Sequence, residues 1–325
     1  MKCAIHATFG APVDVMTLGD SPLPEPAAGQ VRIKTILSPI HNHDLWTVRG
    51  NYGYKPTLPA IGGTEAVGLV DALGEGVSGV SVGQRVAVAS VHGTWAEYFI
   101  APAAGLIPVP EAIPDEVAAQ LIAMPFSAIS LLEQLNVNAG DWIIQNTANG
   151  AVGKALAMLA TARGVNVINL VRRADAIDEL AALGIGNAIS TDAEGWKDAV
   201  RALVGDASLR AAVDSVGGTA SGDLMNLLGV GGTLFVFGTM TNGPMQISTG
   251  DVIFKQATVR GFWGAVVSAE MAPEKRRELF TELLRAVATG GVVLPVGGIF
   301  GLEGMTDAMR AAEAAGKTGK ILLRP

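Results

Sequence analysis

The stretch that most constrains this chain is the glycine-containing turn in "DWIIQNTANGAVGKALAML", residues 141–159. An apolar run typical of a strand precedes Ala148, and a run with helical periodicity follows it. Ala148-x-Gly150-x-x-Gly153 is a variant of the glycine pattern of dinucleotide-binding βαβ units, with alanine in the first position. Gly150 would let the backbone approach a pyrophosphate, and Gly153 would let the helix pack against its strand. The alternative is a tight strand-to-helix corner that binds no ligand.

The strand after this turn indicates which dinucleotide would bind. The run "VNVINLV" ends at Val171, where an NAD site would place an acidic residue about 20 residues after the glycines. This chain has Arg172 and Arg173 there, and Asp175 falls in the next predicted helix. Paired guanidinium groups suit a 2′-phosphate, so the sequence predicts NADPH rather than NADH. The alternative is two solvent-exposed arginines in a loop.

The hydrophobic pattern predicts an α/β protein with two domains, because 325 residues exceed what one core usually fills. Residues 1–117 carry short apolar runs bounded by Pro and Gly, which are typical of strands. From residue 118 strands and helices alternate, which predicts a doubly wound parallel sheet. "PDEVAAQLIAMPFSAISLLEQL" predicts one helix at the junction, and the final strand "GKILL" could complete either domain.

Composition excludes several classes of function. A net charge of −7 disfavours nucleic acid or an anionic membrane as partner. The single cysteine, Cys3, excludes an internal disulfide and a zinc site built from several thiolates. Without an apolar window of membrane-spanning length or a signal peptide, we expect a cytoplasmic protein with no membrane partner.

With the turn and the arginines placed, the chain resembles the medium-chain dehydrogenase/reductase superfamily. Within it, the chain is most similar to zinc-free members, the mitochondrial-type 2-enoyl thioester reductases and the quinone oxidoreductases. The stretches that carry the resemblance are "SPIHNHDLWTVRGNYGYKPTLPAIGGTEAVG", "GTWAEYFIAP", "IIQNTANGAVG", "INLVRR", "VDSVGG" and "IFKQATVRGFW". The resemblance implies a GroES-like β-barrel domain at residues 1–117 and 291–325, and a Rossmann NADPH-binding domain at residues 118–290.

The same resemblance argues against a catalytic metal. Zinc members have a cysteine before an aspartate in the early loop and a Gly-His-Glu stretch further on. Here the matching positions are His41 and Thr64, and a threonine hydroxyl is a poor zinc ligand. His41 and His43 could in principle hold a metal, but we expect them to pack the loop or contact substrate.

The resemblance also implies roles for individual residues. Tyr52 matches the tyrosine proposed as proton donor in enoyl thioester reductases, and a phenol, with an ordinary pKa of about 10, can donate a proton at neutral pH. Phe262 and Trp263 would cover the nicotinamide, or could simply be core, and Tyr52 could simply pack its loop. The residues matched to the NADPH site are Ser127, Asn149, Gly150, Ala151, Val152, Gly153, Arg172, Arg173, Gly238, Thr239, Met240, Phe262 and Trp263.

The expected activity is NADPH-dependent reduction of a carbon–carbon double bond conjugated to a carbonyl, in a small-molecule substrate such as a 2-enoyl thioester or an enone. A quinone oxidoreductase is the alternative, and a non-catalytic NADPH-binding protein is the second. Enoyl reductases usually carry Asn-Pro-Ser where this chain has His41-Asn42-His43, and Asn where it has Met124. Many relatives are homodimers paired at the edge of the Rossmann sheet, and "ATVRGFWGAVV" is apolar enough for such an edge.

Overall fold

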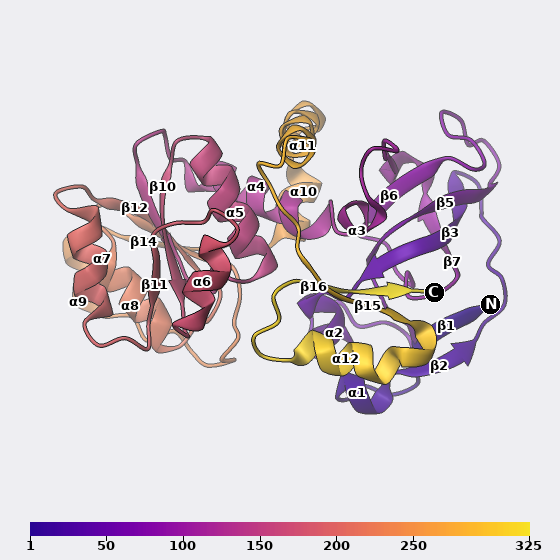
Figure 1. The fold of residues 1–325 in the computed structure, drawn as a ribbon, viewed down its shortest axis with the longest axis horizontal. Coiled ribbons are helices and arrows are strands. Elements are labelled where there is room, and N and C mark those ends of the chain that lie inside the picture. Colours follow the sequence, from indigo (N-terminus) through magenta and orange to yellow (C-terminus); the bar gives the residue numbers. More distant parts are fainter. The chain divides into compact units, whose positions relative to one another are not determined.

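The computed structural model describes residues 1–325, and the chain divides into two compact units. Met1–Ala123 and Leu294–Pro325 form the β-rich unit, and Met124–Val293 form the parallel-sheet unit (Figure 1). No helix in either unit combines the length and the hydrophobicity that a membrane crossing requires.

Short strands separated by turns make up most of the β-rich unit, as its Pro- and Gly-punctuated sequence predicts. Its strands are β1 (Lys2–His6), β2 (Thr17–Asp20), β3 (Gln30–Pro39), β4 (Ala60–Ile61), β5 (Glu65–Leu73), β6 (Arg85–Ala89), β7 (Tyr98–Pro102), β8 (Ile107–Pro108), β15 (Val296–Gly301) and β16 (Lys320–Arg324). Its helices are α1 (Pro12–Val15), α2 (Asn42–Val48), α3 (Asp115–Ala118) and α12 (Met305–Glu313). A seven-stranded sheet has the order β15-β16-β3-β5-β6-β8 with β7 on β3, and a three-stranded sheet has the order β2-β1-β4.

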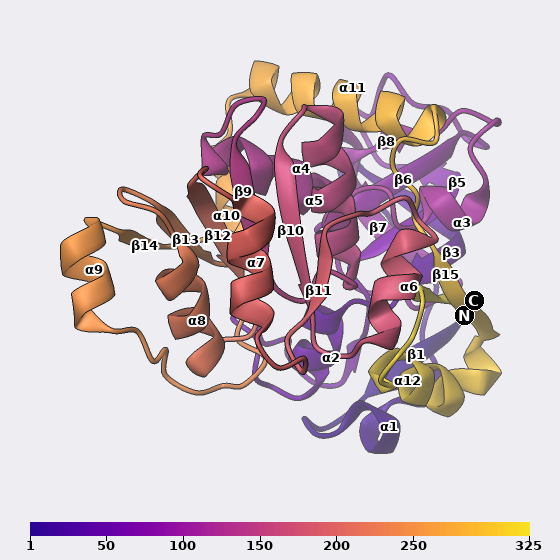
Figure 2. The ribbon, with the colours of Figure 1, turned by 60° about the vertical axis from the view of Figure 1, so that its left-hand side comes forward.

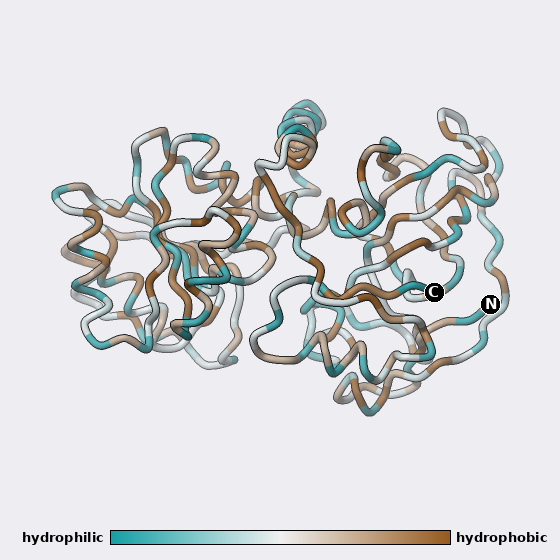
Figure 3. The backbone as a smooth tube through the Cα atoms, in the orientation of Figure 1, coloured by the Kyte–Doolittle hydropathy of each residue, from teal (hydrophilic) through white to brown (hydrophobic).

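The C-terminal strand β16 completes the β-rich unit, which decides the question that the sequence leaves open. It pairs antiparallel with β3, where Leu323 lies opposite Ser38, and parallel with β15. Leu323 is fully buried in a core cluster with Trp95 and with Met309 of α12. β16 is accordingly one of the hydrophobic stretches in Figure 3. The chain therefore returns to its first unit after completing the second.

The parallel-sheet unit alternates strands and helices as the sequence predicts. Its six strands have the order β11-β10-β9-β12-β13-β14, and every pairing is parallel (Figure 2). The strands are β9 (Trp142–Gln145), β10 (Asn166–Val171), β11 (Ala188–Ser190), β12 (Leu209–Asp214), β13 (Thr233–Val236) and β14 (Thr258–Gly261). The helices are α4 (Ala123–Leu135), α5 (Ala151–Ala162), α6 (Asp175–Ala181), α7 (Trp196–Val204), α8 (Thr219–Leu227), α9 (Thr249–Lys255), α10 (Gly264–Glu270) and α11 (Pro273–Ala288).

Helices cover both faces of this sheet. Figure 1 shows α7, α8 and α9 on one side of the strands and α4 and α5 on the other. On the first side, Val200 and Leu224 pack in one cluster with Ile168 of β10. The alternate residues Ile143 and Val167 are buried as well, so the strands read as continuous apolar runs. The direction of strand progression reverses between β9 and β12, and sheets of this kind bind ligands at the carboxyl ends of the strands at that point.

The junction between the units differs from its prediction. The structure divides after Ala123 and after Val293, rather than after residues 117 and 290. The single helix expected over residues 114–135 is also two helices, α3 and α4. The first boundary and the break in the helix have one cause: the N–H groups of Ile122 and Ala123 donate to the side chain of Glu65 instead of continuing a helix from α3. Such a long-range contact leaves no trace in the local pattern.

Candidate functional site

A hydrogen-bonded turn carries the chain from β3 into α2 and positions the two histidines of "HNHD". The N–H of His41 donates to Asp44 Oδ2 over 2.9 Å, the backward contact of a capping box. His41 and Asp44 are both buried. The turn therefore fixes the points at which the side chains of His41 and His43 leave the backbone.

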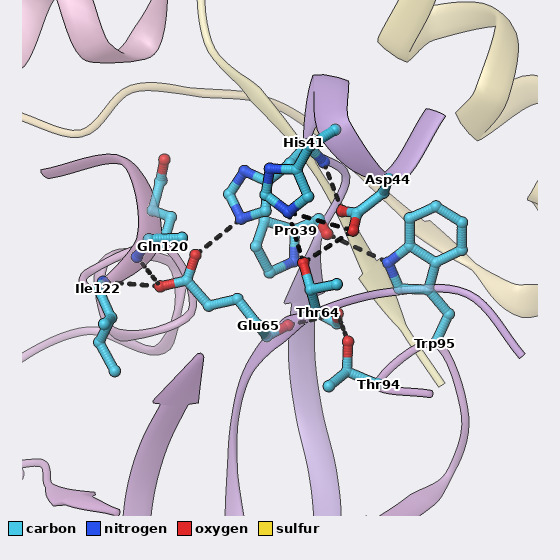
Figure 4. A network of polar contacts seen from close by, with 12 residues as sticks. Pro39, His41, Asp44, Thr64, Glu65, Thr94, Trp95, Gln120 and Ile122 are labelled. Carbon is cyan, nitrogen blue, oxygen red and sulfur yellow. Dashed lines mark hydrogen bonds and ion pairs between the residues drawn. The ribbon is translucent and has the colours of Figure 1, made fainter. Parts of the chain in front are cut away.

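The buried carboxylate of Glu65, the first residue of β5, joins three segments of the β-rich unit. Its Oε1 accepts the N–H groups of Ile122 at 2.6 Å and Ala123 at 2.9 Å. Its Oε2 lies 2.7 Å from His41 Nε2 (Figure 4). Since Glu65 and His41 are both 0% exposed, these contacts replace the hydration that the carboxylate and His41 Nε2 would have in water.

Burial acts in opposite directions on this pair. It raises the pKa of Glu65 to about 7, although the two backbone N–H donors pull that pKa down. It lowers the pKa of His41 well below the ordinary histidine value. Both shifts disfavour the charged form, so the pair carries at most one negative charge at neutral pH.

A cation from β16 interacts with this pair. Burial lowers the pKa of Lys320 to about 8, while Asp44 and Glu65 act to raise it. In return the ammonium helps to lower the pKa values of Glu65 and His41. The return of the C-terminal strand thus brings a positive charge to the acidic side chains of the site.

His43 belongs to a second hydrogen-bonded group. The Thr64 hydroxyl donates to Asp44 Oδ1 over 2.7 Å (Figure 4). His43 Nε2 lies 2.7 Å from the same hydroxyl oxygen. A threonine hydroxyl has a single hydrogen. Because Asp44 accepts that hydrogen, His43 Nε2 must be the donor in the other contact. The neutral ring therefore carries its proton on Nε2.

Aromatic contacts place the two tyrosines of "NYGY" differently. Tyr52 lies against the ring of His43, with 5.7 Å between ring centroids, and His43 in turn stacks on His41 at 5.0 Å. Tyr54 stacks instead on His92 at 4.2 Å. Only Tyr52, the predicted proton donor, is therefore in direct contact with the histidines of the turn.

The side chains present do not fit a catalytic zinc. No three His, Cys, Asp or Glu side chains are arranged to hold a metal ion. Cys3 is buried in β1 near the carbonyl of Gly19, and His41 Nε2 is engaged with Glu65. The donor set of this site supplies hydrogen bonds rather than metal coordination.

The glycine turn of the parallel-sheet unit has the geometry that a dinucleotide needs. Gly150 is the N-cap of α5, and no side chain caps the helix there. The N–H groups of the first turn also have no partner within the helix. A Cβ on Gly153 would lie 2.8 Å from backbone atoms of Thr147 and Ala148. Asn149, Ala151 and Val152 complete this turn and are partly exposed. The turn thus offers both the close packing and the free amide groups of a phosphate site.

The two predicted arginines differ in their surroundings. Arg173 forms ion pairs with Asp175 at 3.1 Å and with Glu179 at 3.6 Å. Arg172 is exposed at the end of β10 and has no ion pair within the chain. Of the two, only Arg172 therefore has a guanidinium that is free to bind a phosphate. The guanidinium of Arg173 is already paired with acidic side chains, which would compete with a phosphate.

A buried polar cluster, which sequence reasoning missed, organises the carboxyl ends of β9 and β12. Asp214 Oδ1 accepts from Asn146 Nδ2 at 2.7 Å and from the N–H groups of Val216 and Gly217. The same strand end receives the loop after β13, because the N–H of Gly238 donates to the carbonyl of Asp214. This aspartate belongs to the motif "VDSVGG". The sequence signal that could have revealed the cluster is a single acidic residue within an apolar strand. The cluster lies at the point where the strand order reverses.

The remaining predicted residues lie in the same unit. Thr239 and Met240 follow Gly238 and are exposed, and Met240 is 66% exposed. Phe262 is buried and stacks on Phe237, whereas Trp263 is 56% exposed at the N-cap of α10. Ser127, in α4, is partly buried beside Gly264, where a Cβ would come within 2.9 Å of its hydroxyl. Phe262 thus packs in the core, and Trp263 presents its ring to the surface of the unit.

Comparison with known proteins finds a matching family for each of the two units. The family model of the alcohol dehydrogenase GroES-like domain matches residues 27–111, and that of the zinc-binding dehydrogenases matches residues 151–277. The human mitochondrial enoyl-[acyl-carrier-protein] reductase is 33% identical over 321 residues, covering 96% of this chain and 85% of that protein. Two solved structures align over the full length of both chains with a TM-score of 0.88: a mycobacterial protein in complex with NADPH, at 28% identity, and a Pseudomonas syringae quinone oxidoreductase, at 25% identity. These matches confirm the predicted fold class, a GroES-like domain with a Rossmann domain.

The unequal surroundings of the arginines lead to a test of the cofactor prediction. If the Arg172 guanidinium meets a 2′-phosphate, Arg172→Ala should weaken NADPH binding by about 10- to 150-fold, because a hydrogen bond to a charged group contributes about 1.5–3 kcal/mol. NADH binding should not change. Arg173→Ala is the matched variant and should lose less, because that guanidinium is shared with Asp175 and Glu179. Fluorescence titration with both dinucleotides measures the effect, and equal losses of NADPH and NADH affinity in the Arg172 variant would contradict it.

Proposed function

The chain belongs to the medium-chain dehydrogenase/reductase superfamily, and we propose that it is an NADPH-dependent reductase of carbon–carbon double bonds conjugated to a carbonyl. The substrate class is a 2-enoyl thioester or a related enone. Curated relatives named enoyl-[acyl-carrier-protein] reductase support the proposal, at 33% identity over 96% of the chain. The solved structures with NADPH and quinone oxidoreductase in their names support an NADPH-dependent oxidoreductase.

The observation that carries this function is the set of side chains in the β-rich unit. A phenol, Tyr52, contacts an imidazole that is hydrogen-bonded towards a buried carboxylate, and no metal-binding group accompanies them. Reduction of an enone needs a hydride at the β carbon and a proton at the enolate that develops. Proton donors of this kind suit that second requirement.

The cofactor has a matching set of residues in the parallel-sheet unit. NADPH, when bound, supplies the hydride. The free N–H groups at the start of α5 and the unpaired guanidinium of Arg172 would hold its phosphates, and Gly153 keeps the helix close to its strand. The chain contributes binding and orientation, and the nicotinamide carries out the redox chemistry.

A quinone oxidoreductase is the second candidate. The alignment with a quinone oxidoreductase structure over the whole of both chains favours it. So does the sequence His41-Asn42-His43, which replaces the Asn-Pro-Ser typical of enoyl reductases. A reduced quinone can take its protons from water, so the two reactions differ in their need for Tyr52. A non-catalytic NADPH-binding protein would turn over neither substrate.

We further propose that the chain forms a homodimer along β14. This strand is the last in its sheet, and all four of its residues are exposed. Exposed apolar residues lie in this strand and near it in the sequence, with Val259 of β14 38%, Phe254 83% and Trp263 56% exposed. An unpaired strand edge with apolar neighbours is suited to pairing with a second chain.

Light scattering tests this proposal. The expected mass is twice the 33.3 kDa of one chain. Val259→Asp, a charge on the edge strand, should shift the population towards monomer, whereas Val82→Asp, an exposed valine of the other unit, should not. A mass near 33.3 kDa for the unaltered chain at micromolar concentration would reject the dimer.

The proposed reaction is tested by Tyr52→Phe, which keeps the ring against His43 and removes the hydroxyl. With a crotonyl thioester and NADPH, kcat should fall by about 10²–10⁴-fold, the usual contribution of a general acid. NADPH affinity should be unchanged, and any quinone reduction should be much less affected. Tyr54→Phe is the matched control and should be near neutral, because Tyr54 stacks on His92 instead.

Two results would count against the proposal in different ways. An unchanged crotonyl reduction rate in Tyr52→Phe would remove Tyr52 from the mechanism. An unaltered enzyme that reduces quinones but no enoyl thioester or enone would replace the proposed function with the second candidate.

A further inference from the structure

His43 has the properties of a proton carrier rather than of a residue that only packs its loop. Its side chain is 24% exposed, whereas those of His41 and Asp44 are 0% and 1% exposed. One edge of the ring is fixed, because Nε2 donates to Thr64, and the other edge carries the second ring nitrogen, Nδ1. The ring lies against Tyr52, the proposed proton donor.

The charges around His43 suit a ring that gains and loses a proton. The Asp44 carboxylate lies 3.4 Å from Nε2 and would balance the charge of an imidazolium. His41, stacked on the other face, is kept neutral by burial and adds no positive charge. The titratable groups that interact with His43 from the surrounding elements are Asp44, His41, Tyr52, Glu65 and His92, with Lys320 beyond His41.

We propose that His43, held by Thr64 and Asp44, returns a proton to Tyr52 during each turnover. This inference rests on the proposed enone reduction. The enolate takes the phenolic proton: a carbon–hydrogen bond forms at the α carbon and the Tyr52 oxygen–hydrogen bond breaks. The phenolate then takes the Nδ1 proton of the His43 imidazolium. Neutral His43, whose side chain is 24% exposed, regains a proton from water, and no oxidant or reductant other than NADPH is needed.

The geometry assigns each partner a distinct part. Asp44 supplies the fixed negative charge, and its own position is fixed by the N–H of His41. The Thr64 hydroxyl donates its hydrogen to Asp44, so that its oxygen accepts a hydrogen bond from His43 Nε2. This contact prevents the ring from flipping and exchanging the positions of its two nitrogens. His43 thus acts through Tyr52 and is a positioning and proton-supplying residue.

The variant that isolates this role is His43→Gln. The glutamine Nε2 can replace the imidazole Nε2 as donor to Thr64, but the amide cannot titrate. We expect kcat for crotonyl thioester reduction to fall at least about tenfold, below the 10²–10⁴-fold effect of a direct general acid. The pH profile of kcat should also differ between the unaltered enzyme and the variant, because the amide cannot carry the proton that the imidazole would donate. NADPH affinity and any quinone reduction should be unchanged.

His92→Gln is the matched control, since it removes another imidazole of the same unit that has no hydrogen bond to Thr64 or Asp44. It should retain both the rate and the pH profile. If His43→Gln keeps the rate and the pH dependence of the unaltered enzyme, the inference is overturned while the proposed function stands. If the unaltered enzyme reduces no enone or enoyl thioester, the proposed function fails and the inference fails with it.

A measurement on the unaltered protein covers the case in which His43→Gln does not fold. The chain has four histidines, so their ¹⁵N signals can be separated by NMR. Neutral His43 should show its proton on Nε2. A neutral ring protonated on Nδ1 would contradict the assigned hydrogen bonds and overturn the inference.

Discussion

The contact on which most of the β-rich unit's site depends is the buried carboxylate of Glu65. It binds His41 on one side and the N–H groups of Ile122 and Ala123 on the other, across 24, 57 and 58 residues of sequence. Removing the carboxylate would leave these buried partners without this hydrogen bond, which costs more free energy than the loss of a single surface contact. The anchored His41 then fixes the turn into α2, and with it Asp44 and His43.

The same carboxylate is part of a group of buried side chains whose pKa values are shifted by burial. Its pKa is raised to about 7 by burial, and the pKa of Lys320 is lowered to about 8 by the same cause. Charges that are costly to bury are thus partly neutralised. Lys320, from the last strand, places a positive charge near the acidic side chains of Asp44 and Glu65.

The parts of the molecule that follow local rules could be predicted from the sequence. Strand periodicity and the glycine spacing predicted the parallel sheet and the turn at Gly150, because both depend on residues close together in the chain. The break between α3 and α4, the placement of β16 and the Asp214 cluster could not be predicted from periodicity, because each depends on partners far away in sequence. The arginine pair is an intermediate case: its position was predictable, but the ion pairs of Arg173 to α6 appear only in three dimensions. Likewise, the spacing of His41 and His43 left metal binding open, and their hydrogen-bond partners indicate proton chemistry.

The central claim is that this chain reduces an activated double bond with NADPH through hydrogen-bonding side chains and without a metal. The most direct test is NADPH oxidation with a panel of crotonyl thioesters, enones and quinones, before and after exhaustive dialysis against a strong chelator. The account predicts turnover of an enoyl thioester or enone, at a rate that the chelator does not change and that added zinc does not increase. A large loss of activity on dialysis that zinc restores would contradict it.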